Sequence, residues 1–402
     1  MADDTATMTA GPGRSPGPDT PDAPRRPSPD GPRRPNSLTE RRMPRLAWLY
    51  SLGGALAASA LLFALAGWSW GGFLVVTAIA YLVAITGWTR VVEGPQKASN
   101  ALWSGLVWCA FLLALIPLVS ILYTVLRQGL PGVTTFGFFG SDMVGVTGVQ
   151  DQASVAHGTA VIGGIKHALI GSVLITLMAT LISVPIGLLT SIYLVEYSRD
   201  GWFPHAVRLL VDVMTGIPSI VAGLFAAAAM MVVMAQVSGG TSGGKQIMGF
   251  TASLALSVLM IPVVVRTTEE MLRVVPNELR EASYAMGIRK WRTVLRVVIP
   301  TAISGIASGV TLAIARVVGE TAPILVTAGF AQNTNTDLFK NWMMSLPVYI
   351  YTQLINPTAP SAPGPSSQRA WGAALVLIAI VMVLNLLARL IARVFAPKTS
   401  GR

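Results

Sequence analysis

Cysteine and histidine are scarce in this chain of 402 residues, which contains one cysteine and three histidines. A single cysteine, Cys109, excludes an intramolecular disulfide and a cysteine-based metal cluster. The histidines, His157, His167 and His205, have no ligand spacing among themselves, and we read them as polar decoration of loops and helix ends. The sequence therefore predicts neither a metal site nor a catalytic residue.

Charged side chains are also few. They make up 12% of the sequence, whereas hydrophobic residues make up 52% and the mean hydropathy is +0.61. So little charge excludes a water-soluble globule and is typical of an integral membrane protein. Acidic residues are scarcer than basic ones, 18 against 29. Because the basic residues are spread among the loops, we read their excess as a signal of membrane orientation and expect no nucleic-acid partner.

Long apolar runs, in contrast, are abundant, and each approaches the ~20 residues that a membrane-spanning helix needs. They lie near residues 46–67, 71–89, 102–126, 168–195, 206–236, 250–267, 301–328 and 371–394. The sequence therefore predicts an all-α integral membrane protein with eight spans. Only residues 67–72 separate the first two runs, which leaves a re-entrant pair as the alternative to a spanning hairpin.

Lysine and arginine predict the orientation of these spans, because cytoplasmic loops are enriched in them. With both termini in the cytoplasm, most basic residues fall on the cytoplasmic side, including those of the loop 272–300. The exceptions are Arg127, Lys166, Lys245, Lys340 and Arg369 in the external segments and Arg316 within a span. We therefore expect the loop 272–300 on the side where ATP is available.

The two ends of the chain differ from the rest. Residues 1–45 are rich in proline, glycine, aspartate, serine and arginine without apolar periodicity, which predicts a disordered cytoplasmic tail. The first apolar run begins too late and is too long for a secretory signal peptide. We divide the chain into this tail, an N-terminal transmembrane hairpin (46–100), a main membrane domain (101–395) and a short cytoplasmic tail (396–402).

Between the sixth and seventh apolar runs lies a polar segment that predicts a short helix. Pro276 and Asn277 favour a start, since proline disfavours the helical conformation of the residue before it and asparagine caps free amides. Gly287 favours a stop, because glycine adopts the left-handed C-terminal conformation without a Cβ clash. The resulting helix of about nine residues carries an apolar stripe that needs a partner. The stripe consists of Leu279, Ala282 and Met286.

A second helix is expected after Gly287, with Arg289, Arg292 and Arg296 recurring beside Trp291. Basic residues next to tryptophan on one helix are typical of contact with an anionic membrane surface. We therefore expect membrane lipid as a partner of this segment.

The polar segment reads Glu-Ala-Ser-Tyr-Ala-Met-Gly at 281–287 and is followed after nine residues by Val-Val-Ile-Pro at 297–300. This spacing resembles the signature loop of the membrane subunits of binding-protein-dependent ABC importers, which is Glu-Ala-Ala, three residues, glycine, nine residues, Ile-x-Leu-Pro. The departures are Ser283, Val297 and Ile299, all of similar size. The resemblance implies that a separate ATPase docks on this loop. Its docking residues are Asn277, Glu281, Ala282, Ser283, Gly287 and Pro300.

A charged residue, Arg316, stands near the middle of the seventh run, with Glu320 one helical turn further on the same face. An arginine at the centre of a membrane helix costs about 2.5–3.5 kcal/mol on insertion scales, so it usually faces a bundle interior or a watery path. Two readings follow. The two residues form an ion pair that pins the helix to its neighbours. Alternatively, Arg316 lines the path of an anion such as phosphate, whose oxygens suit the guanidinium fork, and Glu320 allows release.

Three stretches extend the resemblance. They read Ala-Arg-Val-Val-Gly-Glu-Thr-Ala-Pro at 315–323, Thr-Gly-Ile-Pro-Ser-Ile-Val-Ala-Gly-Leu-Phe at 215–225, and Ser-Val-Pro-Ile-Gly at 183–187 with Tyr-Leu-Val-Glu-Tyr at 193–197. They are similar to stretches of the PstA permeases of bacterial phosphate importers. That resemblance implies a six-helix ABC importer permease core, preceded here by two extra N-terminal helices. It also implies a substrate path formed by Arg316, Glu320, Thr321, Gly216, Pro218 and Ser219.

Glycine and proline inside two of the apolar runs predict local features of the helices. Pro218 removes a backbone donor and Gly216 loosens the helix, so that carbonyl groups and the Ser219 hydroxyl face a cavity, unless the turn is only a kink. Gly305 and Gly309 have the spacing that allows close helix approach, which predicts packing and no chemistry.

The family works as part of a complex, so the resemblance also implies partners and a location. They are a second related permease subunit, two copies of an ATPase subunit, an extracytoplasmic phosphate-binding protein, inorganic phosphate and the bacterial cytoplasmic membrane. The external segments 127–167 and 329–370 are candidates to receive the binding protein. A permease for another oxyanion, such as sulfate or molybdate, and an ion-driven secondary transporter are the alternatives.

An ATP-binding phosphate loop is not predicted in the chain itself. The nearest string, Gly-Gly-Thr-Ser-Gly-Gly-Lys-Gln at 239–246, has Gln246 where serine or threonine should hold Mg²⁺. It lies in an external loop with no strand before it, and we read it as a flexible linker. We therefore expect this chain to bind no cofactor and to be no enzyme by itself, with ATP and magnesium used by the partner ATPase.

Overall fold

The computed structural model describes residues 43–198, 201–237 and 247–394. Apart from residues 43–45, the predictions for the two tails and for the string 239–246 lie outside this range. The chain forms two compact units, Met1–Ile116 and Pro117–Arg402. Each unit is described by itself.

All regular secondary structure in the described part is helical. The α-helices are α1 (Ala47–Ala66), α2 (Trp70–Val92), α3 (Pro95–Val133), α4 (Gly148–His157), α5 (Lys166–Ile192), α6 (Trp202–Thr215), α7 (Ser219–Val237), α8 (Gly249–Val274), α9 (Asn277–Ala285), α10 (Lys290–Thr293), α11 (Ile299–Val318), α12 (Ala322–Thr327), α13 (Leu346–Ile355) and α14 (Gly364–Val394). Two π-helical turns, η1 (Tyr193–Tyr197) and η2 (Val294–Val298), extend α5 and precede α11. Eight helical segments within the described ranges are long and apolar enough to cross a membrane. The all-α membrane class and the number of spans are confirmed.

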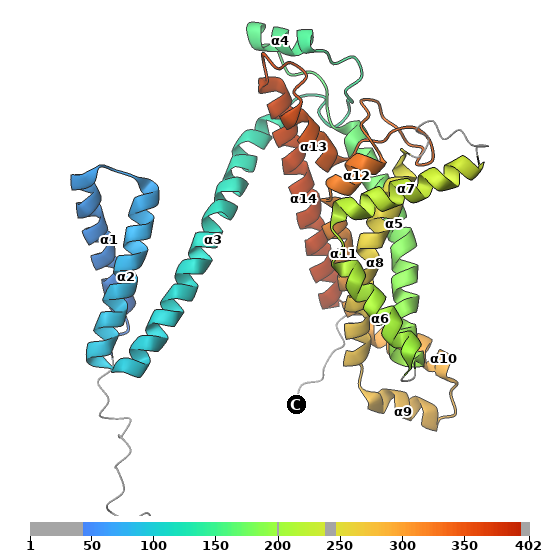
Figure 1. Ribbon diagram of the computed structural model, residues 1–402, viewed down its shortest axis with the longest axis horizontal. Helices are drawn as coiled ribbons and strands as arrows, with labels where there is room; N and C mark the ends of the chain where they lie inside the picture. The colour runs from blue at the N-terminus through green and yellow to red at the C-terminus, as the bar shows by residue number, and fades with distance from the viewer. Residues whose placement is uncertain (1–42, 199–200, 238–246, 395–402) are drawn as a thin grey trace, which may run out of the picture. The chain divides into compact units, whose positions relative to one another are not determined.

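In the first unit α1 and α2 pack along each other as a helical hairpin (Figure 1). They have 20 and 23 residues, which at 1.5 Å per residue is enough for each to cross the apolar core of a bilayer. Gly67 has a φ of +97°, and the Ser69 hydroxyl accepts the amide of Gly72 at 3.2 Å to start α2. These lengths favour a spanning hairpin over the alternative of a re-entrant pair.

The core of the second unit is built on α5 and α8, which pack side by side. Serine hydroxyls join them: Ser191 donates to the Val265 carbonyl at 2.9 Å, and Ser253 donates to the Ile175 carbonyl at 3.1 Å. Such bonds satisfy hydroxyl groups where no water is available. The remaining contact surface is apolar and fully buried, as at Leu256. The pair therefore forms a rigid centre for the helices around it.

Helix α11 packs on the other face of α8 through the predicted pair of glycines. A Cβ on Gly309 would lie 2.7 Å from the Thr267 hydroxyl, and one on Gly305 would overlap the Met271 side chain. Because the missing side chains let the two backbones approach, the predicted packing role of this glycine pair is confirmed.

Two of the predicted spans are interrupted, which corrects the continuous runs 206–236 and 301–328. The first is split into α6 and α7 at Gly216, Ile217 and Pro218, and the second into α11 and α12 at Gly319, Glu320 and Thr321. Hydropathy does not detect these breaks. The residues of the first break are nearly as apolar as the helices around it, and the second break is too short to lower the average hydropathy of the run. The proline that follows each break cannot donate the helical hydrogen bond that would continue the helix.

Three short helices, α4, α9 and α10, mark the two opposite ends of the second unit (Figure 1). α9 and α10 are at one end, called here the α9 end, and α4 is at the other, called the α4 end. The motif-bearing loop 272–300 therefore lies far from the two long segments that follow α3 and α12.

Candidate functional site

The predicted helix in the loop is present as α9, and its length of nine residues is confirmed. Gly287 follows it with a φ of +73°, as expected for a glycine stop. One detail of the prediction was wrong: Pro276 occupies the cap position, and Asn277 is the first helical residue. The Asn277 amide oxygen does not cap the helix but accepts a hydrogen bond from Arg280 Nη1 at 3.1 Å.

The apolar stripe of α9 lies on the surface of the chain. Leu279 is 42% exposed and Met286 is 73% exposed, and Glu281 and Ala282 between them are exposed as well. No other part of the described chain covers these side chains. Exposed apolar side chains on a helix that has few other apolar residues indicate a surface for another protein. We call the surface formed by Leu279, Glu281, Ala282 and Met286 the docking face.

Ser283 and Pro300, two other residues of the predicted docking set, do not belong to this face. Ser283 is buried, and its hydroxyl lies 2.8 Å from that of Thr293 in α10. Pro300 is the second residue of α11, directly after the π-helical turn η2. Because the helix runs without a break from α10 through η2 into α11, the missing amide of Pro300 leaves one helical hydrogen bond unmade next to the π-helical turn. These residues shape the loop that presents α9.

Arg316 lies in the last turn of α11 and is exposed. α11 ends at Val318 because Gly319 breaks the helix, and Glu320 follows outside it. The structure therefore contradicts the expectation that Glu320 shares a helical face with Arg316 and neutralises it. No ion pair or hydrogen bond in the described part of the chain involves the Arg316 side chain. In a membrane segment such a charge requires a partner subunit, water or an anion.

The turn at Gly216 and Pro218 is an interruption and more than a kink. The Pro218 carbonyl accepts the amides of Val221 and Ala222 at 2.9 and 3.2 Å, which completes the first turn of α7. Gly216 and Pro218 are exposed, and Ser219 is half-buried.

The two interrupted helices pack against each other beyond their breaks. α7 contacts α12, and a Cβ on Gly223 would lie 2.7 Å from Pro323 Cα. Thr321 is the cap residue of α12, and its side chain makes no capping hydrogen bond. The parts of the two predicted path motifs that follow the breaks therefore lie against each other, one in α7 and the other in α12.

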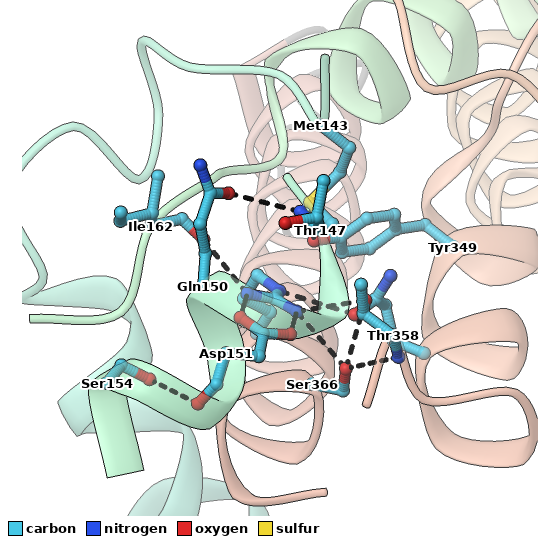
Figure 2. Close-up of polar contacts among 11 residues, drawn as sticks. Met143, Thr147, Gln150, Asp151, Ser154, Ile162, Tyr349, Thr358 and Ser366 are labelled. Carbon is cyan, nitrogen blue, oxygen red and sulfur yellow. Dashed lines mark hydrogen bonds and ion pairs between the residues drawn. The ribbon is translucent and has the colours of Figure 1, made fainter. Parts of the chain in front are cut away.

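At the α4 end, Arg369 of α14 forms an ion pair that the sequence did not suggest (Figure 2). Its Nη1 and Nη2 donate to the two carboxylate oxygens of Asp151 in α4 at 2.9 and 2.6 Å. Both side chains are 1% exposed. Two parallel bonds between a guanidinium and a carboxylate are the strongest common form of this contact. We call this pair and its hydrogen-bonding partners the α4 clamp.

The α4 clamp also connects the loop between α4 and α5 to α13 and the loop that follows it. Arg369 donates from Nη1 to the Ile162 carbonyl at 2.9 Å and from Nη2 to the hydroxyls of Thr358 and Ser366 at 3.2 and 3.1 Å. Its Nε reaches the Gln353 side chain at 3.3 Å. A buried guanidinium with all its donors engaged is satisfied despite its burial. The two long segments predicted to be external are therefore one ordered assembly.

His167 lies at the start of α5, a helix end as expected, but it is 1% exposed. Its ring meets that of Tyr349 edge to face, with 5.3 Å between centroids. Neither ring nitrogen has a hydrogen-bond partner among the described residues. His167 lines a cavity of about 570 Å³ together with polar residues of α13 and of the loops beside it.

At the α9 end several arginines pair with carboxylates, again unpredicted. Glu269 of α8 accepts from Arg208 of α6 at 3.3 Å and from Arg273 at 2.5 Å, and Arg266 pairs with Asp212. The pairs of Arg208 with Glu269 and of Asp212 with Arg266 hold α6 against the C-terminal part of α8, whereas Arg273 pairs with Glu269 within α8. Sequence reasoning treated the same arginines only as signals of orientation.

Comparison with known proteins identifies the family in which these features occur. The profile of the family described as "Binding-protein-dependent transport system inner membrane component" matches residues 183–401. The chain belongs to this family. The matched range contains α9, both helix interruptions and Arg316.

Relatives of this permease cover most of its length. It is 43% identical over 296 residues to phosphate transport system permease protein PstA 1 of Mycobacterium tuberculosis (strain CDC 1551 / Oshkosh), which is 74% of this chain and 89% of the relative. It is 42% identical over 297 residues to PstA of Mycobacterium leprae (strain TN), covering 74% and 90% of the two chains. It is 34% identical over 309 residues to PstA of Yersinia pestis, covering 77% and 94%.

Two of the unpredicted contacts of this permease join residues that are far apart in the sequence. Asp151 and Arg369 are separated by 218 positions in the sequence, and Glu196 and Arg280 by 84. No local spacing signals such a pair. One hint was available for the second pair. Glu196 lies in the motif at 193–197, and Arg280 directly precedes the motif at 281–287.

Proposed function

We propose that this chain is a transmembrane permease subunit of an ATP-driven phosphate importer. The observation that carries the proposal is the docking face of α9, an exposed apolar stripe on a short helix held in place by the rest of the loop. Exposed apolar side chains grouped in this way are typical of a contact surface for another protein. An ATPase that binds it moves α9, and the spans reorient by alternating access around a site between them.

Phosphate is the cargo that the relatives and Arg316 together support. Three relatives carry the name of phosphate transport permeases. Arg316 is exposed and has no partner within the described chain, so its guanidinium is available to a ligand. A guanidinium binds phosphate through paired, charge-assisted hydrogen bonds. Glu320, Thr321, Gly216, Pro218 and Ser219 are proposed to line the same path.

The proposal also fixes the orientation and the partners. The α9 end faces the cytoplasm, where two ATPase subunits bind ATP and magnesium, and this chain binds neither. The α4 end faces outward and receives the phosphate-binding protein. A second, related permease subunit completes the path. Both termini are cytoplasmic in the bacterial cytoplasmic membrane, and lipid surrounds the spans.

The docking role is tested by Glu281→Lys. This substitution reverses an exposed charge beside the apolar side chains of the docking face, and Glu281 makes no contact with the buried side of α9. We expect it to abolish ATP-driven phosphate uptake by membrane vesicles while the amount of protein in the membrane stays at the wild-type level. Wild-type uptake in this variant would rule out the docking role.

The cargo is tested by transport of different labelled anions. Vesicles with the wild-type complex are given phosphate, sulfate or molybdate, and uptake is compared with and without ATP. We expect uptake of phosphate alone. Preferred uptake of sulfate or molybdate would assign the chain to another oxyanion, and uptake driven by an ion gradient without ATP would make it a secondary transporter.

A further inference from the structure

The Arg280 side chain of α9 reaches from the docking helix to the ends of the membrane helices α5 and α8. It lies on the opposite side of α9 from the docking face, and its side chain is 13% exposed. Its partner Glu196, in the π-helical turn η1 at the end of α5, is only 4% exposed. The guanidinium is therefore nearly enclosed although α9 itself lies on the surface.

The contacts of Arg280 divide between two membrane helices. Nε and Nη2 both donate to Glu196 Oε1, at 3.0 and 2.9 Å, which connects α9 to the end of α5. Nη2 also donates to the Leu272 carbonyl at 2.9 Å, and Nη1 donates to the Val275 carbonyl at 2.6 Å. These two carbonyls belong to the C-terminal end of α8, where the last carbonyl groups of a helix lack partners. One side chain therefore joins α9, α5 and α8.

Other contacts make the joined ends of α5 and α8 a single body. Arg208 donates to the Leu194 carbonyl in η1 at 3.2 Å and to Glu269 of α8 at 3.3 Å. The helices α5 and α8 also form the packed centre of the unit. A π-helical turn widens the backbone and is frequent at functional sites. A displacement of α9 that is passed to Glu196 thus acts directly on the core of the permease.

We propose that Arg280 is the positioning residue that transmits movement of the docking helix α9 into the membrane helices α5 and α8. This proposal rests on the proposed function, because it assumes that an ATPase moves α9. A lysine has one ammonium group, which cannot reach the Glu196 carboxylate and the two carbonyls at the end of α8 simultaneously. Without Arg280, α9 moves with the ATPase but the movement is not transmitted to α5 and α8, so ATP is hydrolysed without transport.

The test uses the complete importer, with this chain and its partner subunits, reconstituted in liposomes. Labelled phosphate uptake and ATP hydrolysis are measured on the same vesicles, and their ratio is the readout. In Arg280→Lys we expect the ratio to fall about tenfold or more, with ATP hydrolysis retained and the ATPase still co-purifying. Arg389→Lys, the same substitution at an exposed arginine of α14, is the matched control and keeps the wild-type ratio.

A ratio in Arg280→Lys equal to that of wild type, at whatever absolute rates, would overturn the proposal. If this variant does not assemble, Glu196→Gln decides, because it removes the charged partner and leaves the carbonyl contacts of Arg280 in place. The same fall in the ratio is expected there, and an unchanged ratio counts against the proposal. Should the wild-type complex not transport phosphate, the cargo assignment fails on its own, and the ratio is measured with the anion that it does transport.

Discussion

The two ends of the second unit each contain a buried arginine, but the two arginines are held differently. Arg369 at the α4 end is 1% exposed, forms a two-pronged pair with Asp151 and engages loops from far along the chain. Arg280 at the α9 end is 13% exposed, and most of its contacts are to helix ends and residues of its own loop. Arg369 is enclosed by the residues that it binds, whereas Arg280 connects the surface helix α9 to the core helices.

This difference indicates different mechanical roles. Charges without access to water contribute stability only while every partner is in place, so the α4 end resists partial opening. At the α9 end the same chemistry leaves the docking face of α9 uncovered. We infer that the α4 end serves as a fixed surface and that the α9 end is the part of the permease that a partner moves. Four changes would break or sharpen this comparison.

The largest effect is expected from Arg369→Met, which leaves the Asp151 carboxylate buried and unpaired. Loss of one member of a buried ion pair typically costs about 3–5 kcal/mol. We expect a clearly lower unfolding temperature of the purified protein in detergent, measured by differential scanning fluorimetry. The double variant Arg369→Met with Asp151→Leu should recover most of the loss, because no buried charge remains. If Arg369→Met alone were as stable as wild type, the buried ion pair would not stabilise the α4 end.

Two glycine substitutions compare the packing of the two ends. In Gly171→Ala the new methyl group overlaps the backbone carbonyl of Met344 at the α4 end, and in Gly305→Ala it overlaps only the side chain of Met271. Overpacking against a fixed backbone costs about 1–3 kcal/mol, whereas a flexible methionine can move away. Thermal unfolding of both variants should show the larger loss for Gly171→Ala. Equal losses would mean that both ends are packed alike.

The docking face is tested by Leu279→Ser and Met286→Ser together. Both side chains are exposed in the isolated chain, so we expect the unfolding temperature to stay within about one degree of wild type. Binding should suffer, since removing two apolar anchors costs roughly 1–3 kcal/mol of affinity. The measurement is the amount of ATPase subunit that co-purifies with the permease in mild detergent. Phe339→Ser, at an exposed residue of the α4 end, is the control, and it should leave ATPase binding unchanged.

The smallest effect is expected from Ser283→Ala, which removes the hydrogen bond between the Ser283 and Thr293 hydroxyls. A single neutral hydrogen bond contributes about 0.5–1.5 kcal/mol. Alanine is also the residue of the signature loop that this segment resembles. We expect a small fall in unfolding temperature and wild-type uptake. Loss of uptake would show that Ser283 acts in coupling and not only in holding α9 to α10.

Much of the loop and part of the helix packing could be predicted from neighbouring residues alone. The nine-residue α9, its stop at Gly287 and the glycine pair of α11 depend on local backbone preference and on periodicity, both of which are present in a short window. The expected pair of Arg316 and Glu320 failed for the same reason. Spacing of four residues places side chains on one face only if the helix continues, and Gly319 ends it.

The sequence by itself determined that this chain is a helical membrane protein with the short polar helix α9, because hydropathy and local propensity act within a few turns of helix. Tertiary structure decided which charges are paired. It placed Arg369 against Asp151 and Arg280 against Glu196, and it left Arg316 without a partner in the described chain. The physical reason is that an ion pair requires two atoms within a few ångströms, and only the packing of distant helices brings them there.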